Sequence, residues 1–85
     1  MFLHPKAAKA LEKMNAVDKA RIREALRELG GNPEKVGKQL KLSDFWSLRI
    51  GDYRAIYEID QDENQVIVLF VGHRKKVYDN FTKML

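Results

Sequence analysis

The sequence predicts an α+β fold, because apolar side chains recur at helical spacing near its start and at a period of two after residue 45. Residues 5–31 carry the helical spacing, whereas residues 45–71 alternate or run apolar as strands do. Separate runs of helices and of strands are typical of helices packed on one side of an antiparallel sheet. We therefore expect a single domain over residues 1–85, with an N-terminal helical hairpin packed on a small antiparallel β-sheet and a short C-terminal helix.

Two amphipathic helices are expected in the first third of the chain. Phe2–Leu3 suggests a short strand before them, and Pro5 suits the first position of a helix because its missing N–H needs no partner there. Asn15 is the expected cap of the second helix, which Gly30–Gly31 should end. The predicted buried positions are Ala7, Ala10, Leu11 and Met14 in the first helix and Ile22, Ala25, Leu26 and Leu29 in the second. The short connection makes these helices an antiparallel hairpin.

Three strands are expected in the second half of the chain, over residues 45–50, 53–59 and 66–71. The preceding segment 32–44 has no clear period and should be a loop with one turn of helix. Gly51–Asp52 fits the two-residue loop of a type II′ hairpin turn, which prefers glycine first. Val77, Phe81 and the last two residues recur at helical spacing, which predicts the short C-terminal helix.

This hairpin turn places two arginines side by side. Arg49 should lie directly opposite Arg54, on the face away from the core positions Trp46, Leu48, Ile50, Tyr53, Ala55 and Tyr57. Like charges in such a pair cost up to ~1 kcal/mol, and a bound anion or an acidic partner is the simplest reason to keep them. The alternative is a solvated face on which they bridge to Glu58 or to helix carboxylates. Arg74, after the last strand, could converge on the same face and favours the anion site.

Composition limits the chemistry of such a domain. The 85 residues include no cysteine, which excludes disulfides, thiolate catalysis and cysteine-type zinc sites. Two histidines make a poor metal site, so we expect no metal or other cofactor. The net charge of +4 favours a polyanion or an acidic protein partner only weakly. There is neither a bilayer-spanning apolar run nor a signal-peptide pattern, so we expect no membrane association and a cytoplasmic location.

Three segments resemble the RelE/ParE superfamily of toxins from toxin–antitoxin pairs. They are the opening His4–Leu11, the strand pair Leu48–Arg54 and the ending His73–Tyr78, and the likeness covers nearly the whole chain. The resemblance implies the toxin component of a type II toxin–antitoxin system. Its RelE branch implies a ribosome-dependent endoribonuclease that cleaves mRNA in the A site and inhibits translation. The implied partners are a cognate acidic antitoxin, the ribosome and mRNA.

The resemblance also implies candidate catalytic residues. Arg49 matches a basic strand residue of the RelE active site, Arg54 the arginine of a Tyr-Arg pair, Arg74 the arginine after the last long strand, and Tyr78 the C-terminal tyrosine. Ser47 departs from this pattern, because RelE-type enzymes have another lysine there. Lys75, Lys76 or a loop lysine would have to substitute for it.

RNA cleavage at such a site would use the 2′-hydroxyl as nucleophile and leave a 2′,3′-cyclic phosphate and a 5′-hydroxyl. Arg49 and Arg54 are the candidates for stabilising charge on the phosphorane oxygens, and Arg74 could do the same or lie beside the leaving group. Tyr78 could stack on a base, or act as general base if arginines lower its pKa from ~10. His73 is the alternative base, with a reference pKa of ~6.5, and otherwise caps a carbonyl at the strand end.

Two other functions stay open at this point. A ParE-like inhibitor of DNA gyrase would be an interaction protein rather than an enzyme, and the clustered arginines with Tyr78 argue against it. An inactive toxin-fold protein that keeps antitoxin binding would account for Ser47.

Overall fold

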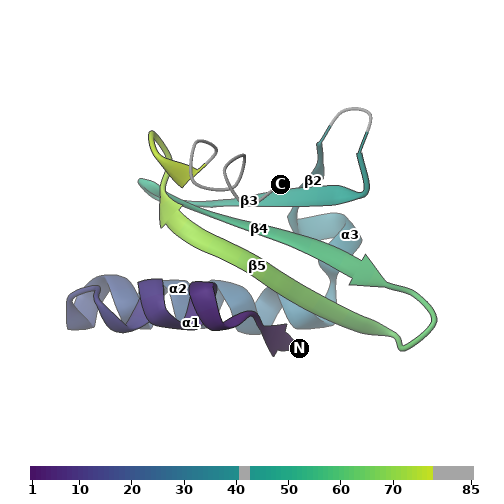
Figure 1. Cartoon of the computed structure of the whole chain (residues 1–85), viewed down its shortest axis with the longest axis horizontal. Helices are drawn as coiled ribbons and strands as arrows, with labels where there is room; N and C mark the ends of the chain where they lie inside the picture. Colours follow the sequence, from purple (N-terminus) through teal and green to yellow (C-terminus); the bar gives the residue numbers. More distant parts are fainter. Residues whose placement is uncertain (41–42, 78–85) are drawn as a thin grey trace.

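A computed structural model describes residues 1–40 and 43–77 and confirms the α+β class (Figure 1). The elements are β1 (Phe2–Leu3), α1 (Pro5–Glu12), α2 (Ala16–Gly31), α3 (Pro33–Val36), β2 (Lys38–Gln39), β3 (Phe45–Ile50), β4 (Tyr53–Asp60) and β5 (Gln65–His73). The strands form a five-stranded sheet in the order β1-β5-β4-β3-β2. Helix α1 and helix α2, which runs back along it, lie on one face of this sheet (Figure 1).

Both helices begin at the residues that the sequence marks, but α1 ends at Glu12, so the predicted helical position Met14 lies just beyond it. Pro5 opens α1, and the Nδ1 atom of His4 accepts a hydrogen bond from the backbone N–H of Lys6 at 3.2 Å. Asn15 caps α2, because its Oδ1 atom accepts from the N–H of Asp18 at 2.8 Å. Helix α2 ends at Gly31, as predicted. The helix side chains fully or almost fully buried against the sheet are Ala7, Leu11, Ile22, Leu26 and Leu29.

The central hairpin of β3 and β4 has the predicted register. Ile50 pairs with Tyr53, and Arg49 pairs with Arg54. Gly51 has a φ of +60°, and the other positive φ in the described part of the chain belongs to Asn64, so the turn has the single left-handed residue of type II′. The register of side chains on each face therefore follows from the loop that the sequence marks.

Two short strands at the edges differ from the expectation. Strand β1 pairs with β5 in parallel, so the sheet is mixed rather than wholly antiparallel. Strand β2 pairs antiparallel with β3 inside the segment expected to be a loop, where α3 is the predicted single turn of helix. Two residues are too few to show an alternating pattern, and Lys38–Gln39 is polar on both sides, so nothing in the sequence marked β2 as a strand.

The sheet carries unequal cores on its two faces. The helix-covered face holds the larger one, to which the strands contribute Leu48, Ile50, Ala55, Tyr57, Val66, Val68 and Val71. The opposite face holds a small cluster of Ile56 and Val77, with Phe45, Leu69 and Phe70 packed against it. The predicted C-terminal helix falls mostly on residues 78–85, which lie outside the described residues. Within the described ranges, none of the helices is both long and apolar enough to cross a membrane.

Candidate active site

Arg49 and Arg54 lie next to each other on the face of the sheet that α1 and α2 leave open. They are directly paired across β3 and β4, and their neighbours Leu48, Ile50 and Ala55 are buried on the helix-covered side. Successive side chains of a strand point to opposite faces, so both guanidinium groups leave from the open face. The like-charged pair that the sequence predicted is therefore present.

Hydrogen bonds to neighbouring groups orient both guanidinium groups. The Nε atom of the exposed Arg49 donates to the carbonyl oxygen of Gly51 at 3.3 Å. The Nη1 atom of the half-buried Arg54 donates to the Oγ atom of Ser47 at 2.9 Å. No carboxylate in residues 1–40 or 43–77 forms an ion pair with Arg49, so the alternative of carboxylate bridging does not apply to this residue there.

Ser47 is a buried polar residue, only 4% exposed, and its hydroxyl is the hydrogen-bond acceptor for Arg54. It lies on the open face, because it is two residues before Arg49 and pairs with Ile56. A hydroxyl at this position adds no charge, but it fixes the direction of the neighbouring guanidinium. The residue that departs from the RelE pattern thus contacts a predicted site residue.

Arg74 is brought to the same end of the sheet. Its backbone N–H donates to the carbonyl oxygen of Asp52 in the hairpin turn, at 2.8 Å. Gly72, two residues earlier, pairs with Arg54. Figure 1 shows the end of β5 beside the β3–β4 turn, so the three arginines come from adjoining backbone segments. Arg74, Lys75 and Lys76 are all exposed.

His73 is on the other side of the sheet from the arginine pair. It pairs with Tyr53, and their rings meet edge to face with centroids 6.0 Å apart. The hydroxyl of Tyr53 donates to Asp18 of α2 at 2.9 Å, which fixes this pair on the helix-covered face. The Nδ1 atom of His73 accepts from the N–H of Lys75 at 3.3 Å, so the ring caps an N–H rather than a carbonyl.

Tyr78, the remaining predicted site residue, lies outside the described residues. The residue before it, Val77, is fully buried against Ile56 on the open face. A Cβ atom placed on Gly72 would lie 3.7 Å from the Cβ atom of Val77, which is ordinary van der Waals contact. The chain therefore turns back over the face that carries the arginines.

The two described tyrosines of the hairpin are held in their neutral form. The hydrogen bond of Tyr53 to Asp18 raises the pKa of its phenol, with further contributions from burial and from the charges of Asp18 and Asp52. Burial raises the pKa of Tyr57 to about 12, and its hydroxyl donates to the carbonyl oxygen of Pro33 at 2.6 Å. Neither phenol is suited to act as a base near neutral pH, and both serve packing, as expected from their core positions.

Two basic residues near the arginines were not named individually as site residues, although a lysine of the loop 32–44 was expected as one possible substitute for the lysine missing at Ser47. Lys38 of β2 pairs with Ser47, so it shares the open face. Arg21 of α2 approaches the hairpin turn, because a Cβ atom on Gly51 would lie 2.9 Å from its Nη1 atom. Lys38 fell in a segment expected to be a loop, and no local pattern relates Arg21 to a turn thirty residues later.

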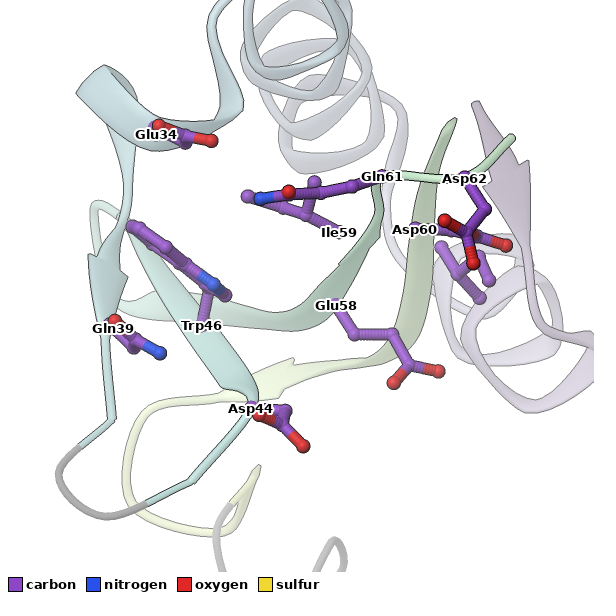
Figure 2. A pocket seen from close by; sticks show the side chains of 10 residues that line it. Glu34, Gln39, Asp44, Trp46, Glu58, Ile59, Asp60, Gln61 and Asp62 are labelled. Atoms are coloured by element: carbon purple, nitrogen blue, oxygen red, sulfur yellow. The ribbon is translucent and has the colours of Figure 1, made fainter. Parts of the chain in front are cut away.

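A cleft with the opposite charge lies at the other end of the hairpin. Its volume is about 720 Å³, and Figure 2 shows acidic side chains around it from α3, from the residue before β3, from the end of β4 and from the turn after β4. These carboxylates belong to Glu34, Asp44, Glu58, Asp60 and Asp62, with Trp46 and Gln39 beside them. A phosphodiester would be repelled there, so the arginine end is the better candidate for an anion.

Comparison with known proteins agrees with this fold. A family model described as "ParE toxin of type II toxin-antitoxin system, parDE" matches residues 1–78. Toxin RelG of Mycobacterium tuberculosis is 39% identical over 56 residues, and Toxin RelE of the same organism is 37% identical over 49 residues. These alignments cover 64% and 55% of this chain, and they span 64% and 50% of the lengths of the two relatives.

Solved structures of toxin–antitoxin complexes contain chains with the same fold. The toxin–antitoxin complex RelBE2 of Mycobacterium tuberculosis contains a chain with 32% identity and a TM-score of 0.76, covering 85% of this chain and 93% of that one. A chain of the RelB–RelE complex of Methanococcus jannaschii, at 24% identity, has the same fold with a TM-score of 0.74, covering 95% and 99%. The match over residues 1–78 shows that the chain belongs to the ParE toxin family of type II toxin–antitoxin systems, within the RelE/ParE superfamily.

Proposed function

We propose that this protein is the toxin of a type II toxin–antitoxin system and acts as a ribosome-dependent endoribonuclease that cleaves mRNA and inhibits translation. The observation that carries the proposal is the pairing of Arg49 with Arg54 on the open face, with Arg74 tied by its backbone to the adjoining turn. Three permanent positive charges from adjoining segments suit a phosphodiester, because guanidinium groups donate paired hydrogen bonds to phosphate oxygens.

In the proposed reaction, the RNA supplies its own nucleophile. The 2′-oxygen attacks the adjacent phosphorus, the bond to the 5′-oxygen breaks, and the products are a 2′,3′-cyclic phosphate and a 5′-hydroxyl. Arg54, held by Ser47, and Arg49, held by Gly51, supply fixed donors for the phosphorane oxygens as charge builds up on them. Arg74 contributes to the same stabilisation or lies beside the leaving 5′-oxygen.

The general base, which would take the proton of the 2′-hydroxyl, is proposed from the family resemblance rather than from contacts in the structure. Tyr78 is proposed from the family resemblance, as a base-stacking group or as general base. His73 suits this role less well, because its ring meets Tyr53 on the helix-covered side and its Nδ1 atom accepts a backbone N–H. A His73→Ala variant is therefore expected to lose less activity than Arg54→Ala.

A cognate acidic antitoxin is the proposed partner that keeps the toxin inactive, in the cytoplasm where ribosomes are. Two related structures are described as toxin–antitoxin or antitoxin–toxin complexes, which supports such a partner for this family member. The arginines and the exposed Lys75 and Lys76 offer positive charge to an acidic segment.

Gyrase inhibition is the second candidate, because the matching family model is that of ParE toxins. An inactive toxin that retains antitoxin binding is the third, because Ser47 places a neutral side chain in the site. Both predict a protein that leaves mRNA intact.

The test is to induce the chain in cells and to map the 5′ ends of mRNA at stalled ribosomes, for the wild type, Arg54→Ala and Arg27→Ala. Arg27 is a matched control, because it is an exposed arginine of α2 paired with Glu24 at 3.1 Å. We expect in-frame cleavage by the wild type and Arg27→Ala, and a loss of about 100-fold or more in Arg54→Ala. Accumulated gyrase–DNA breaks would instead support the second candidate, and unimpaired growth the third.

A further inference from the structure

We propose that Lys38 of β2 is a further phosphate-binding residue, which contacts bound RNA beside Arg54. The inference rests on the proposed function, because it names an additional contact to the same RNA. Lys38 and Ser47 are directly paired between β2 and β3. Directly opposite side chains in an antiparallel pair share a face, with Cβ atoms about 5 Å apart. Lys38 therefore shares the face on which Arg49 and Arg54 lie.

The orientation of Arg54 brings its charge toward Lys38. Because its Nη1 atom donates to the Oγ atom of Ser47 at 2.9 Å, the guanidinium leans from β4 over β3. Ser47 itself is buried and neutral, and it separates the two cations without competing for an anion. The sugar–phosphate backbone of an RNA strand bound across these three side chains would meet Arg54 on one side of Ser47 and Lys38 on the other.

Strand β2 is held firmly enough to present a side chain at a fixed place. The N–H of Leu40 donates to the carbonyl oxygen of Phe45 at 2.8 Å, which continues the β2–β3 pairing past Gln39. Gln39 points to the other face, where its Nε2 atom donates to the carbonyl oxygen of Ser43 at 3.0 Å. Before the strand, Gly37 is packed tightly on the ring of Tyr57.

Lys38 is also available for an anion. It is exposed, and no carboxylate within residues 1–40 or 43–77 forms an ion pair with it. Lys35, three residues earlier in α3, is a suitable control with the same charge. It lies away from the arginines, because it lines a hollow with Ile59 and Gln61 at the other end of the sheet. Comparing alanine variants of the two lysines therefore distinguishes a phosphate contact at this site from the general attraction of a basic protein for RNA.

The experiment compares the wild type with Lys38→Ala, Lys38→Arg and Lys35→Ala. The probe is a fully 2′-O-methylated single-stranded oligoribonucleotide, which cannot be cleaved, and its affinity is measured by fluorescence anisotropy at several salt concentrations. Each phosphate contact to a single strand contributes about 0.7 to the slope of log K against log salt. We expect Lys38→Ala to reduce this slope by about 0.7, whereas Lys38→Arg and Lys35→Ala keep the wild-type slope.

Melting temperatures equal to the wild type exclude misfolding as the cause. Equal slopes for Lys38→Ala and Lys35→Ala, or a wild type that fails to bind the probe, would overturn the inference. A ribosome cleavage assay with the same proteins and Arg54→Ala separates this result from the proposed function. If the wild type cleaves mRNA and Arg54→Ala does not, while Lys38→Ala binds and cleaves like Lys35→Ala, only the role of Lys38 fails. If the wild type does not cleave, the proposed function fails, whatever the salt slopes are.

Discussion

Replacing Gly37 by alanine should destabilise the protein through a single steric overlap. A Cβ atom at this position would lie 2.7 Å from the Cζ atom and 2.9 Å from the Cε1 atom of Tyr57, and closer still to its hydroxyl oxygen. Tyr57 is fully buried, and its hydroxyl donates to the carbonyl oxygen of Pro33. The ring cannot move aside without losing this hydrogen bond or disturbing its stacking on Trp46.

The magnitude follows from these contacts. The backbone of Gly37, with φ of −100° and ψ of −178°, is extended, so alanine adopts it without strain and the cost comes from the overlap alone. Overpacking a filled site costs about 1–3 kcal/mol, and a lost hydrogen bond adds about 1 kcal/mol. A total of about 3 kcal/mol lowers the melting temperature of a domain this small by roughly 12–24 °C.

Thermal and urea unfolding of Gly37→Ala beside Gly31→Ala tests this expectation. Nothing lies within 4 Å of a Cβ atom on Gly31, the last residue of α2, so its replacement should leave stability unchanged or raise it by up to about 1 kcal/mol. If Gly37→Ala melts within a few degrees of the wild type, the reasoning from packing is wrong.

Two further outcomes are expected. Because the pKa of Tyr57 is raised to about 12 in the folded protein against ~10 in the unfolded chain, its contribution is present below pH ~10 and is lost as the pH rises from ~10 to about 12. Tyr57→Phe should therefore show a smaller fall in urea stability over that alkaline range, and an equal fall would contradict the assignment. Ser47→Ala should reduce the rate of mRNA cleavage about tenfold, because Arg54 loses the acceptor that orients it, whereas Ser47→Thr keeps a hydroxyl and much of the rate. Equal rates for the alanine and threonine variants would remove Ser47 from the site.

The register of the central hairpin was predictable because it depends on a local signal. Gly51–Asp52 marks a two-residue loop, and a fixed loop fixes the pairing of every residue beside it. The pairing of Arg49 with Arg54 follows at once. The starts of the two helices were likewise local signals, since Pro5 marks the first residue of α1 and the cap Asn15 of α2 bonds only three residues ahead.

The remaining features depend on partners distant in the sequence or on strands too short to show a period. Strand β5 is apolar on both faces, so its sequence does not say on which face His73 lies. β5 also carries one extra residue opposite Ile56/Tyr57. This bulge reverses which face the residues after it point to, compared with a regular strand. Lys38 was hidden for a related reason, because a polar dipeptide gives no sign that it forms an edge strand.

The parallel pairing of β1 with β5 joins Phe2 to Ile67, a residue that is synthesised much later. A nascent chain can form α1 and α2 early, but the sheet on which their apolar faces pack is complete only when β5 has emerged. Arg74 reaches the hairpin turn later still. A ribosome that synthesises this chain has therefore translated past the codon for Arg74 before the groups proposed to cut a message are assembled.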